Sequence, residues 1–104
     1  MNKSVLVLAS FYPKKGMEEA VGKVLNGMII PSRAERGNEI YDLFSETGED
    51  EQVLSYHLLE KYVSAAALVE HQKSDHYCDY RKAIGSLLES PIGVTRLNPI
   101  DARI

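Results

Sequence analysis

Cysteine, tryptophan and long apolar runs are scarce or missing in this chain, and each absence excludes a class of structure. The 104 residues contain one cysteine and no tryptophan. A single thiol cannot form an intramolecular disulfide, so we expect a reducing, cytoplasmic location and a small, buried Cys78. No apolar run approaches the ~18 residues of a membrane span, and the run at 5–9 is too short for a secretory signal, so we expect no membrane partner.

Positive charge is not in excess either. The formal net charge is −3 and the lysines and arginines are scattered, so we expect no nucleic-acid partner. Glycine-rich phosphate loops, dinucleotide fingerprints and serine nucleophile elbows are absent. The sequence also lacks the HxxxH and CxxC patterns of metal sites, and we expect no bound metal.

The residues that are present indicate one folded domain over 1–104, with a tail at about 99–104. Apolar residues make up 44% of the chain and charged residues 26%, which is typical of a globular protein. Residues 5–12 favour a strand, which Pro13 closes. Residues 17–28 place apolar side chains at helical spacing and predict an amphipathic helix.

The middle of the chain predicts a hairpin. Pro31 should end the first helix, and residues 32–36 should form a polar turn. Residues 38–45 and 52–61 have the composition of strands and flank an acidic turn at 46–51. We therefore expect these two strands to pair with each other.

Two short helices should follow the hairpin. The first is expected over 64–73, with Ser64 as its N-cap. The second is expected over 75–88, capped by Ser74 or Asp75. A short helix break is therefore expected between His71 and His76.

A final strand at 92–97 completes the order strand, helix, strand, strand, helix pair, strand. This is the split βαβ order of an α+β, ferredoxin-like fold, with a four-stranded antiparallel sheet and helices on one face. Several strands carry apolar residues on both sides, and the chain has nothing left to cover the second face. We therefore expect a homodimer that forms by sheet-to-sheet packing.

Three segments carry a resemblance to a known family: PSRAERGNEIYDL at 31–43, VLSY at 53–56 and AALVEHQKSDHY at 66–77. In this order they resemble the antibiotic biosynthesis monooxygenase family. The resemblance implies ferredoxin-like protomers that form a dimeric α/β barrel, with a small-molecule cavity between each sheet and its helices. It also implies oxidation of phenols or quinols by dioxygen without a cofactor. Other branches degrade haem or isomerise a phosphorylated sugar.

A departure from the family pattern argues against haem degradation. The haem-degrading relatives resemble one another in that their sites combine an asparagine, a tryptophan and a histidine. The matching positions here are Ala9, His71 and Arg81, and the chain has no tryptophan at all. The oxidation and isomerisation branches both remain open.

Two of the three histidines, His71 and His76, lie on either side of the expected helix break. A phenol that loses its proton can pass an electron to dioxygen, so such an oxidation needs a base and a dry cavity. We assign His71 as this base because Ala67 and Leu68 place it on the inward side of its helix. We assign His76 as a second catalytic residue, a neutral hydrogen-bonding partner in the first turn of the next helix. The plain alternative is that both histidines are structural.

Five further residues are candidates for binding a substrate: Tyr41, His57, Tyr77, Tyr80 and Arg81. Tyr77 and Tyr80 would line the cavity, and packing in the core is the simpler alternative for both. Arg81 would hold a substrate oxygen or phosphate. His57 reaches the cavity only if it faces the helices. If Leu54, Tyr56 and Leu58 face the helices, His57 lies on the dimer face instead.

The sequence leaves three functions open. The first is a cofactor-independent monooxygenase that oxidises a quinol or polyphenol-like molecule with dioxygen. The second is an isomerase of a small carbonyl or sugar-phosphate compound, in which the histidines move a proton between carbons. The third is a non-catalytic dimeric module that binds a small molecule.

Overall fold

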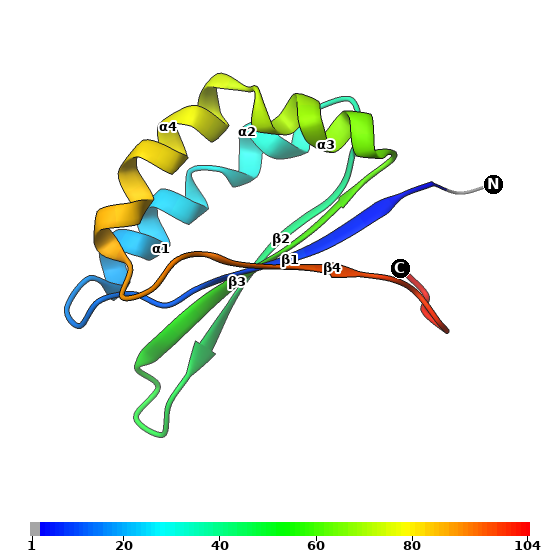
Figure 1. Cartoon of the computed structure of the whole chain (residues 1–104). Helices are drawn as coiled ribbons and strands as arrows, with labels where there is room; N and C mark the ends of the chain where they lie inside the picture. The colour runs from blue at the N-terminus through cyan, green and yellow to red at the C-terminus, as the bar shows by residue number, and fades with distance from the viewer. Residues whose placement is uncertain (1–2) are drawn as a thin grey trace.

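The computed structural model describes residues 3–104, and it places all of the helices on one face of a four-stranded antiparallel sheet (Figure 1). The strand order is β2-β3-β1-β4. This arrangement confirms the predicted α+β, ferredoxin-like fold. The strands are β1 (Val5–Phe11), β2 (Asn38–Thr47), β3 (Val53–Tyr62) and β4 (Gly93–Leu97). The helices are α1 (Glu18–Asn26), α2 (Ile29–Arg33), α3 (Ala65–Gln72) and α4 (Asp75–Ile84), followed by a 3-10 turn, η1 (Gly85–Leu87).

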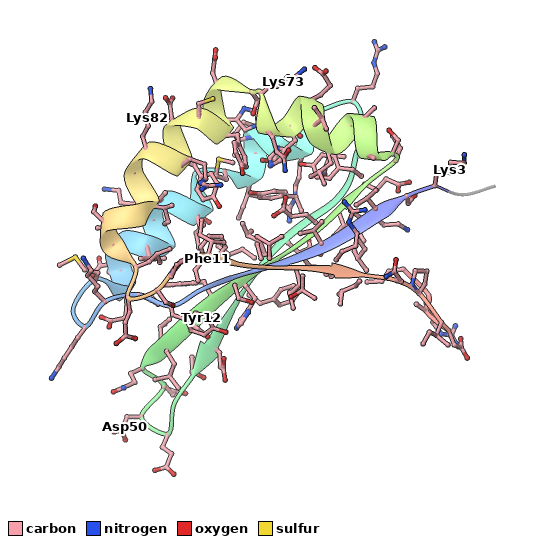
Figure 2. The ribbon with its side chains drawn as sticks, viewed as in Figure 1. Lys3, Phe11, Tyr12, Asp50, Lys73 and Lys82 are labelled. Atoms are coloured by element: carbon pink, nitrogen blue, oxygen red, sulfur yellow. The ribbon has the colours of Figure 1, made fainter. Side chains whose placement is uncertain are left out.

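Alternation along β1 separates the two faces of the sheet. Its odd-numbered residues, from Val5 to Phe11, are buried beneath the helices. Phe11 lies in the core, whereas the next residue, Tyr12, is 42% exposed on the other side (Figure 2). The register of the sheet therefore decides which residues of the other strands reach the helical side.

One cross-strand row on the helical side matters for the site. Val7 of β1 pairs with Glu60 of β3 on one side and with Arg96 of β4 on the other. Glu60 pairs in turn with Tyr41 of β2. The row therefore reads Tyr41, Glu60, Val7, Arg96, and it places two charged residues among apolar neighbours.

The opposite face of the sheet carries apolar residues that no helix of the described chain covers (Figure 1). Phe44 is 52% exposed and Leu97 is 37% exposed on this side. Leu8 and Leu59 pair directly between β1 and β3 and are only partly buried. We call this surface the open sheet face.

Local signals from the sequence are confirmed at the two helix starts. Ser64 caps α3, and its hydroxyl accepts the Ala67 N–H at 3.1 Å. Of the two candidates for the second cap, Ser74 is the one that caps α4, because its hydroxyl accepts the Tyr77 N–H at 3.2 Å. These caps fix where each helix begins.

Three local predictions were wrong. Pro31 does not end helical structure: it lies inside α2, in a first turn where its missing N–H is not needed. The second short helix ends at Ile84 rather than at 88, because the chain tightens into η1 from Gly85. Cys78 is exposed, since it lies on the solvent side of α4 while Tyr80 and Ile84 face inward.

Within residues 3–104, no helix is long and apolar enough to cross a membrane.

Candidate active site

His71 is a deeply buried titratable side chain at the centre of the site. It lies in the last turn of α3 and is 2% exposed. The adjacent connection to α4 is held by Ser74, whose hydroxyl donates to the His71 carbonyl at 2.6 Å. The same hydroxyl caps α4, so one serine fixes both helix ends beside the imidazole.

A single carboxylate, Glu35, joins three side chains that come from β3, α3 and α4. Its oxygens accept hydrogen bonds from His71 Nδ1 at 2.8 Å, from His76 Nε2 at 2.5 Å and from the Tyr62 hydroxyl at 3.0 Å. Glu35 comes from the connection between α2 and β2, which lies over the end of the sheet. Three donors on one partly buried carboxylate form a strong, directional cluster.

The contact with Glu35 determines which nitrogen of His71 is free. A carboxylate accepts hydrogen bonds, so Nδ1 carries the proton and Nε2 keeps its lone pair. Nε2 lies 3.6 Å from Oε1 of Glu60. Burial lowers the pKa of the His71 imidazole, although Glu35 opposes this effect, and the ring is therefore ready to accept a proton at Nε2.

Glu60 is a second buried acid. It is 8% exposed, and burial together with the nearby Glu35 carboxylate raises the pKa of Glu60 to about 7. Glu60 is thus an acid that can gain or lose a proton near neutral pH beside the His71 imidazole.

Tyrosine rings surround the His71 imidazole. The ring centroids of Tyr62, Tyr77 and Tyr41 lie 5.1, 5.2 and 5.7 Å from that of His71. Burial raises the pKa of the Tyr41 and Tyr62 phenols above their usual value, so both stay neutral. The imidazole therefore lies in an apolar shell with one acidic partner on each side.

A cavity of about 290 Å³ opens beside this pair, between the sheet and the helices α3 and α4. Its polar lining includes His71, Glu60, Arg81 and Arg96. The remaining lining residues are Val7, Ala9, Leu68, Gln72, Tyr77, Tyr80, Ile92 and Val94. A mostly apolar pocket with a few polar groups is typical of small-molecule sites.

The structure brings together six of the seven candidate residues. His71, Tyr77, Tyr80 and Arg81 all line the cavity. Tyr41 is buried against His71, although it is not part of the lining. His76, a sixth candidate, does not line the cavity, but it shares Glu35 with His71 and its ring centroid lies 5.8 Å from that of His71.

His57 is the seventh candidate, and the structure places it away from the cavity. It pairs with Ser10 and Phe44 across the open sheet face. Its Nδ1 lies 2.8 Å from the Ser10 hydroxyl, and its Nε2 lies 3.4 Å from Glu46. The strand neighbours Tyr56 and Leu58 face the helices instead, which was the condition for excluding His57.

Sequence reasoning missed Glu35, Glu60 and Arg96. Glu60 could have been found, because it continues the inward alternation of Leu58 and Tyr62. Arg96 carries a weaker signal of the same kind in a short strand. Glu35 carries none, since only the folded connection brings it to His71.

Glu35, His71 and His76 also offer one ligand atom each within 4.8 Å of one another, and so could hold a metal ion. However, Glu35 lies 2.8 and 2.5 Å from the two ring nitrogens. Ligands of a tetrahedral zinc lie about 2.0–2.1 Å from the ion and hence roughly 3.3 Å from each other. The observed spacing fits hydrogen bonds better, and the expectation of no metal stays a prediction.

The family model described as "Antibiotic biosynthesis monooxygenase" matches residues 4–83 of this chain. The match covers all of the helices except the last residue of α4, together with the first three strands. It also includes the cluster of Glu35, Glu60, His71 and His76.

Two named proteins are similar to this chain in sequence. "Putative monooxygenase Rv0793" of Mycobacterium tuberculosis is 42% identical over 101 residues, which cover 97% of this chain and 96% of the relative. "Putative monooxygenase YcnE" of Bacillus subtilis is 37% identical over 69 residues, which cover 66% and 70%. The solved structure of Rv0793 has a TM-score of 0.87 at 39% identity, and the match covers 98% of this chain and 100% of that one.

Proposed function

Because the chain belongs to the antibiotic biosynthesis monooxygenase family, we propose that it oxidises a small quinol or polyphenol-like molecule with dioxygen, without a cofactor. The observation that carries this proposal is the buried His71, with Nδ1 held by Glu35 and Nε2 on the side of Glu60 and the cavity. This is the arrangement of a general base with an orienting acid.

The first step is removal of a proton from the substrate. A phenolic hydroxyl in the cavity donates its proton to Nε2 of His71, and the Glu35 carboxylate stabilises the imidazolium that forms. Glu60, whose pKa is about 7, can take the proton onward or stay ionised beside the imidazolium. The substrate is left as an electron-rich phenolate.

The phenolate then reduces dioxygen directly. One electron passes to dioxygen, and the resulting radical pair combines to form a carbon–oxygen bond at the ring. The imidazolium of His71 returns its proton to the peroxide. Loss of water, whose second hydrogen comes from the same ring carbon, then breaks the oxygen–oxygen bond, so one oxygen atom stays on the ring as a carbonyl and the other leaves as water. The substrate supplies all of the electrons, and the apolar shell formed by Tyr41, Tyr62 and Tyr77 keeps competing water away.

The proposal includes a homodimer. The open sheet face exposes Phe44 and Leu97, and packing against a second copy would bury them. His57 would then lie in the interface rather than in the cavity. We place this dimer in the cytoplasm, in keeping with the single cysteine.

An isomerase remains the second candidate, and the Glu60 carboxyl is the observation that favours it. The Glu60 carboxyl, whose pKa is about 7, and Nε2 of His71 lie 3.6 Å apart on one cavity wall. Such a pair could remove a proton from one carbon and return it to the next. Anaerobic turnover with incorporation of solvent deuterium would identify this reaction.

Oxygen uptake tests the leading proposal. We expect consumption of dioxygen with 1,4-dihydroxynaphthalene above its spontaneous oxidation, and its loss in His71→Gln with an unchanged circular dichroism spectrum. His57→Gln should retain the activity, because His57 lies on the other face of the sheet. Equal rates for the wild type and His71→Gln would refute the assigned base.

A further inference from the structure

Two arginines line the same cavity as Glu60 and His71. Arg81 comes from α4 and Arg96 from β4, so they reach the cavity from opposite layers of the fold. Among residues 3–104, neither guanidinium has a carboxylate within ion-pair distance. Within the described part of the chain, both guanidiniums of the cavity are therefore without a carboxylate in direct contact.

Arg81 is held in place without being neutralised. Its guanidinium donates to the Tyr77 hydroxyl at 3.0 Å and lies 5.9 Å from the centre of that ring. Tyr77 also packs edge-on against His71, with centroids 5.2 Å apart. The same tyrosine thus joins the positive side of the cavity to the base.

The register of the sheet sets the backbone distance between Glu60, on the acidic side of the cavity, and Arg96, on its basic side. Glu60, Val7 and Arg96 occupy one row on three neighbouring strands. Strands lie about 4.8 Å apart, so the backbones of Glu60 and Arg96 are separated by about 10 Å. The two side chains therefore start from strands that are not neighbours, with Val7 between them.

The surface between the two sides is apolar. Val7, Ala9 and Val94 form the sheet side, and Leu68 and Tyr80 belong to the helical side. A sphere of about 290 Å³ is about 8 Å across, so a single flat molecule can touch both sides.

We propose that the substrate of this site carries an anionic group, bound by Arg96 and Arg81, at the end of an aromatic ring system opposite to the hydroxyl that reacts at His71. The inference rests on the proposed function, because that function makes the His71 end the reacting end. A carboxylate is the simplest such group, since a guanidinium binds it through two parallel hydrogen bonds.

Equilibrium binding tests this inference without any turnover. The probe is 6-hydroxy-2-naphthoate, which is fluorescent and carries a hydroxyl and a carboxylate at opposite ends. Its neutral counterpart is 6-hydroxy-2-naphthamide, which has the same shape and no charge. We expect the wild-type protein to bind the naphthoate about tenfold or more tightly than the naphthamide.

Arginine variants then test which residues produce the preference for the naphthoate. Arg96→Gln and Arg81→Gln should each reduce the naphthoate preference severalfold and leave naphthamide binding nearly unchanged, and Arg96→Lys should keep part of it. The matched control is Lys82→Gln, which removes a positive charge from the outward side of α4 (Figure 2) and should change neither affinity. Thermal unfolding of each variant shows that it is folded.

A wild-type protein that binds both probes equally, or that binds neither, would overturn the inference. Retention of the full preference in both arginine variants would do the same. Failure of the proposed oxidation is distinguishable, because it appears as absent oxygen uptake while the binding preference persists. Conversely, oxygen uptake with a neutral quinol and no preference for the anion would leave the oxidation standing and refute only the anion site.

Discussion

The Glu35 carboxylate accepts the Nδ1–H of His71 at 2.8 Å, and this contact leaves the lone pair of Nε2 on the side of Glu60. The two residues are 36 positions apart in the sequence. Whatever proton transfer takes place at His71, Glu35 decides which nitrogen performs it.

Glu35→Gln should therefore impair catalysis more than folding. An amide has one accepting oxygen in place of the carboxylate that accepts three donors, so the tautomer and orientation of His71 are no longer fixed. We expect kcat for oxygen uptake to fall by about 10²-fold or more. Nitrogen-15 NMR of the imidazole should show a loss of the Nδ1–H tautomer, a change that a merely structural role would not produce. The control is Glu70→Gln, which changes an exposed residue on α3, the helix that carries His71.

The raised pKa of Glu60 predicts a specific pH dependence of stability. Its carboxyl has a pKa of about 7 in the folded protein and its ordinary pKa of 4.5 in the unfolded chain, so the folded state binds the extra proton between these values. The stability that Glu60 contributes is present below about pH 4.5 and is lost as the pH rises through about 7. The change amounts to at most about 3 kcal/mol.

The measurement is urea unfolding of the wild type and Glu60→Gln from pH 4.5 to 8. As the pH rises, the unfolding free energy of the wild type should fall relative to that of Glu60→Gln. His71, whose pKa is lowered, acts in the opposite direction in both proteins, since its contribution is lost as the pH falls below about 6.5. A pH-independent difference between the two proteins would contradict the raised pKa of Glu60.

Phe44→Glu should convert a dimer into monomers. Phe44 is 52% exposed on the open sheet face, and a charge there would be costly to bury against a second copy. Light scattering at micromolar concentration should give the mass of two chains for the wild type and of one for the variant. Val69→Glu, which changes a residue 45% exposed on α3, should leave the mass unchanged. A monomeric wild type would refute the sheet-to-sheet arrangement.

Gly37→Ala should lower stability by about 1–3 kcal/mol, because an added Cβ would lie 2.5 Å from the Cβ of Ala67. The clash would push α3 away from the hairpin and disturb His71. Gly85→Ala meets no atom within 4 Å and should be neutral, or stabilising by up to about 1 kcal/mol. Thermal unfolding of Gly37→Ala, with and without Ala67→Gly, measures the effect, and the second change should restore part of the loss.

The fold could be predicted from the sequence because its signals are local. Helical spacing at 17–28, alternation in the hairpin, and the caps Ser64 and Ser74 are each written within a few residues. One exception is α2, where Pro31 was interpreted as an end although it lies in a first turn that tolerates it.

The site could be predicted only in part, for the same reason. His71 was found because Ala67 and Leu68 show which way its helix faces. Glu35 was not, since its contacts depend on how a turn folds over the end of the sheet. The side of the sheet on which His57 lies stayed open, because a polar residue in a strand does not reveal which face is covered.

The long sequence separations within the Glu35 cluster also have a kinetic meaning. Glu35 meets His71 and His76, which are 36 and 41 residues further along the chain, only when the hairpin and both short helices have docked. Loops of this length close late relative to local helices and turns. Return of activity after dilution from denaturant should therefore lag behind the return of helical signal, so that catalysis reports the completion of folding rather than its onset.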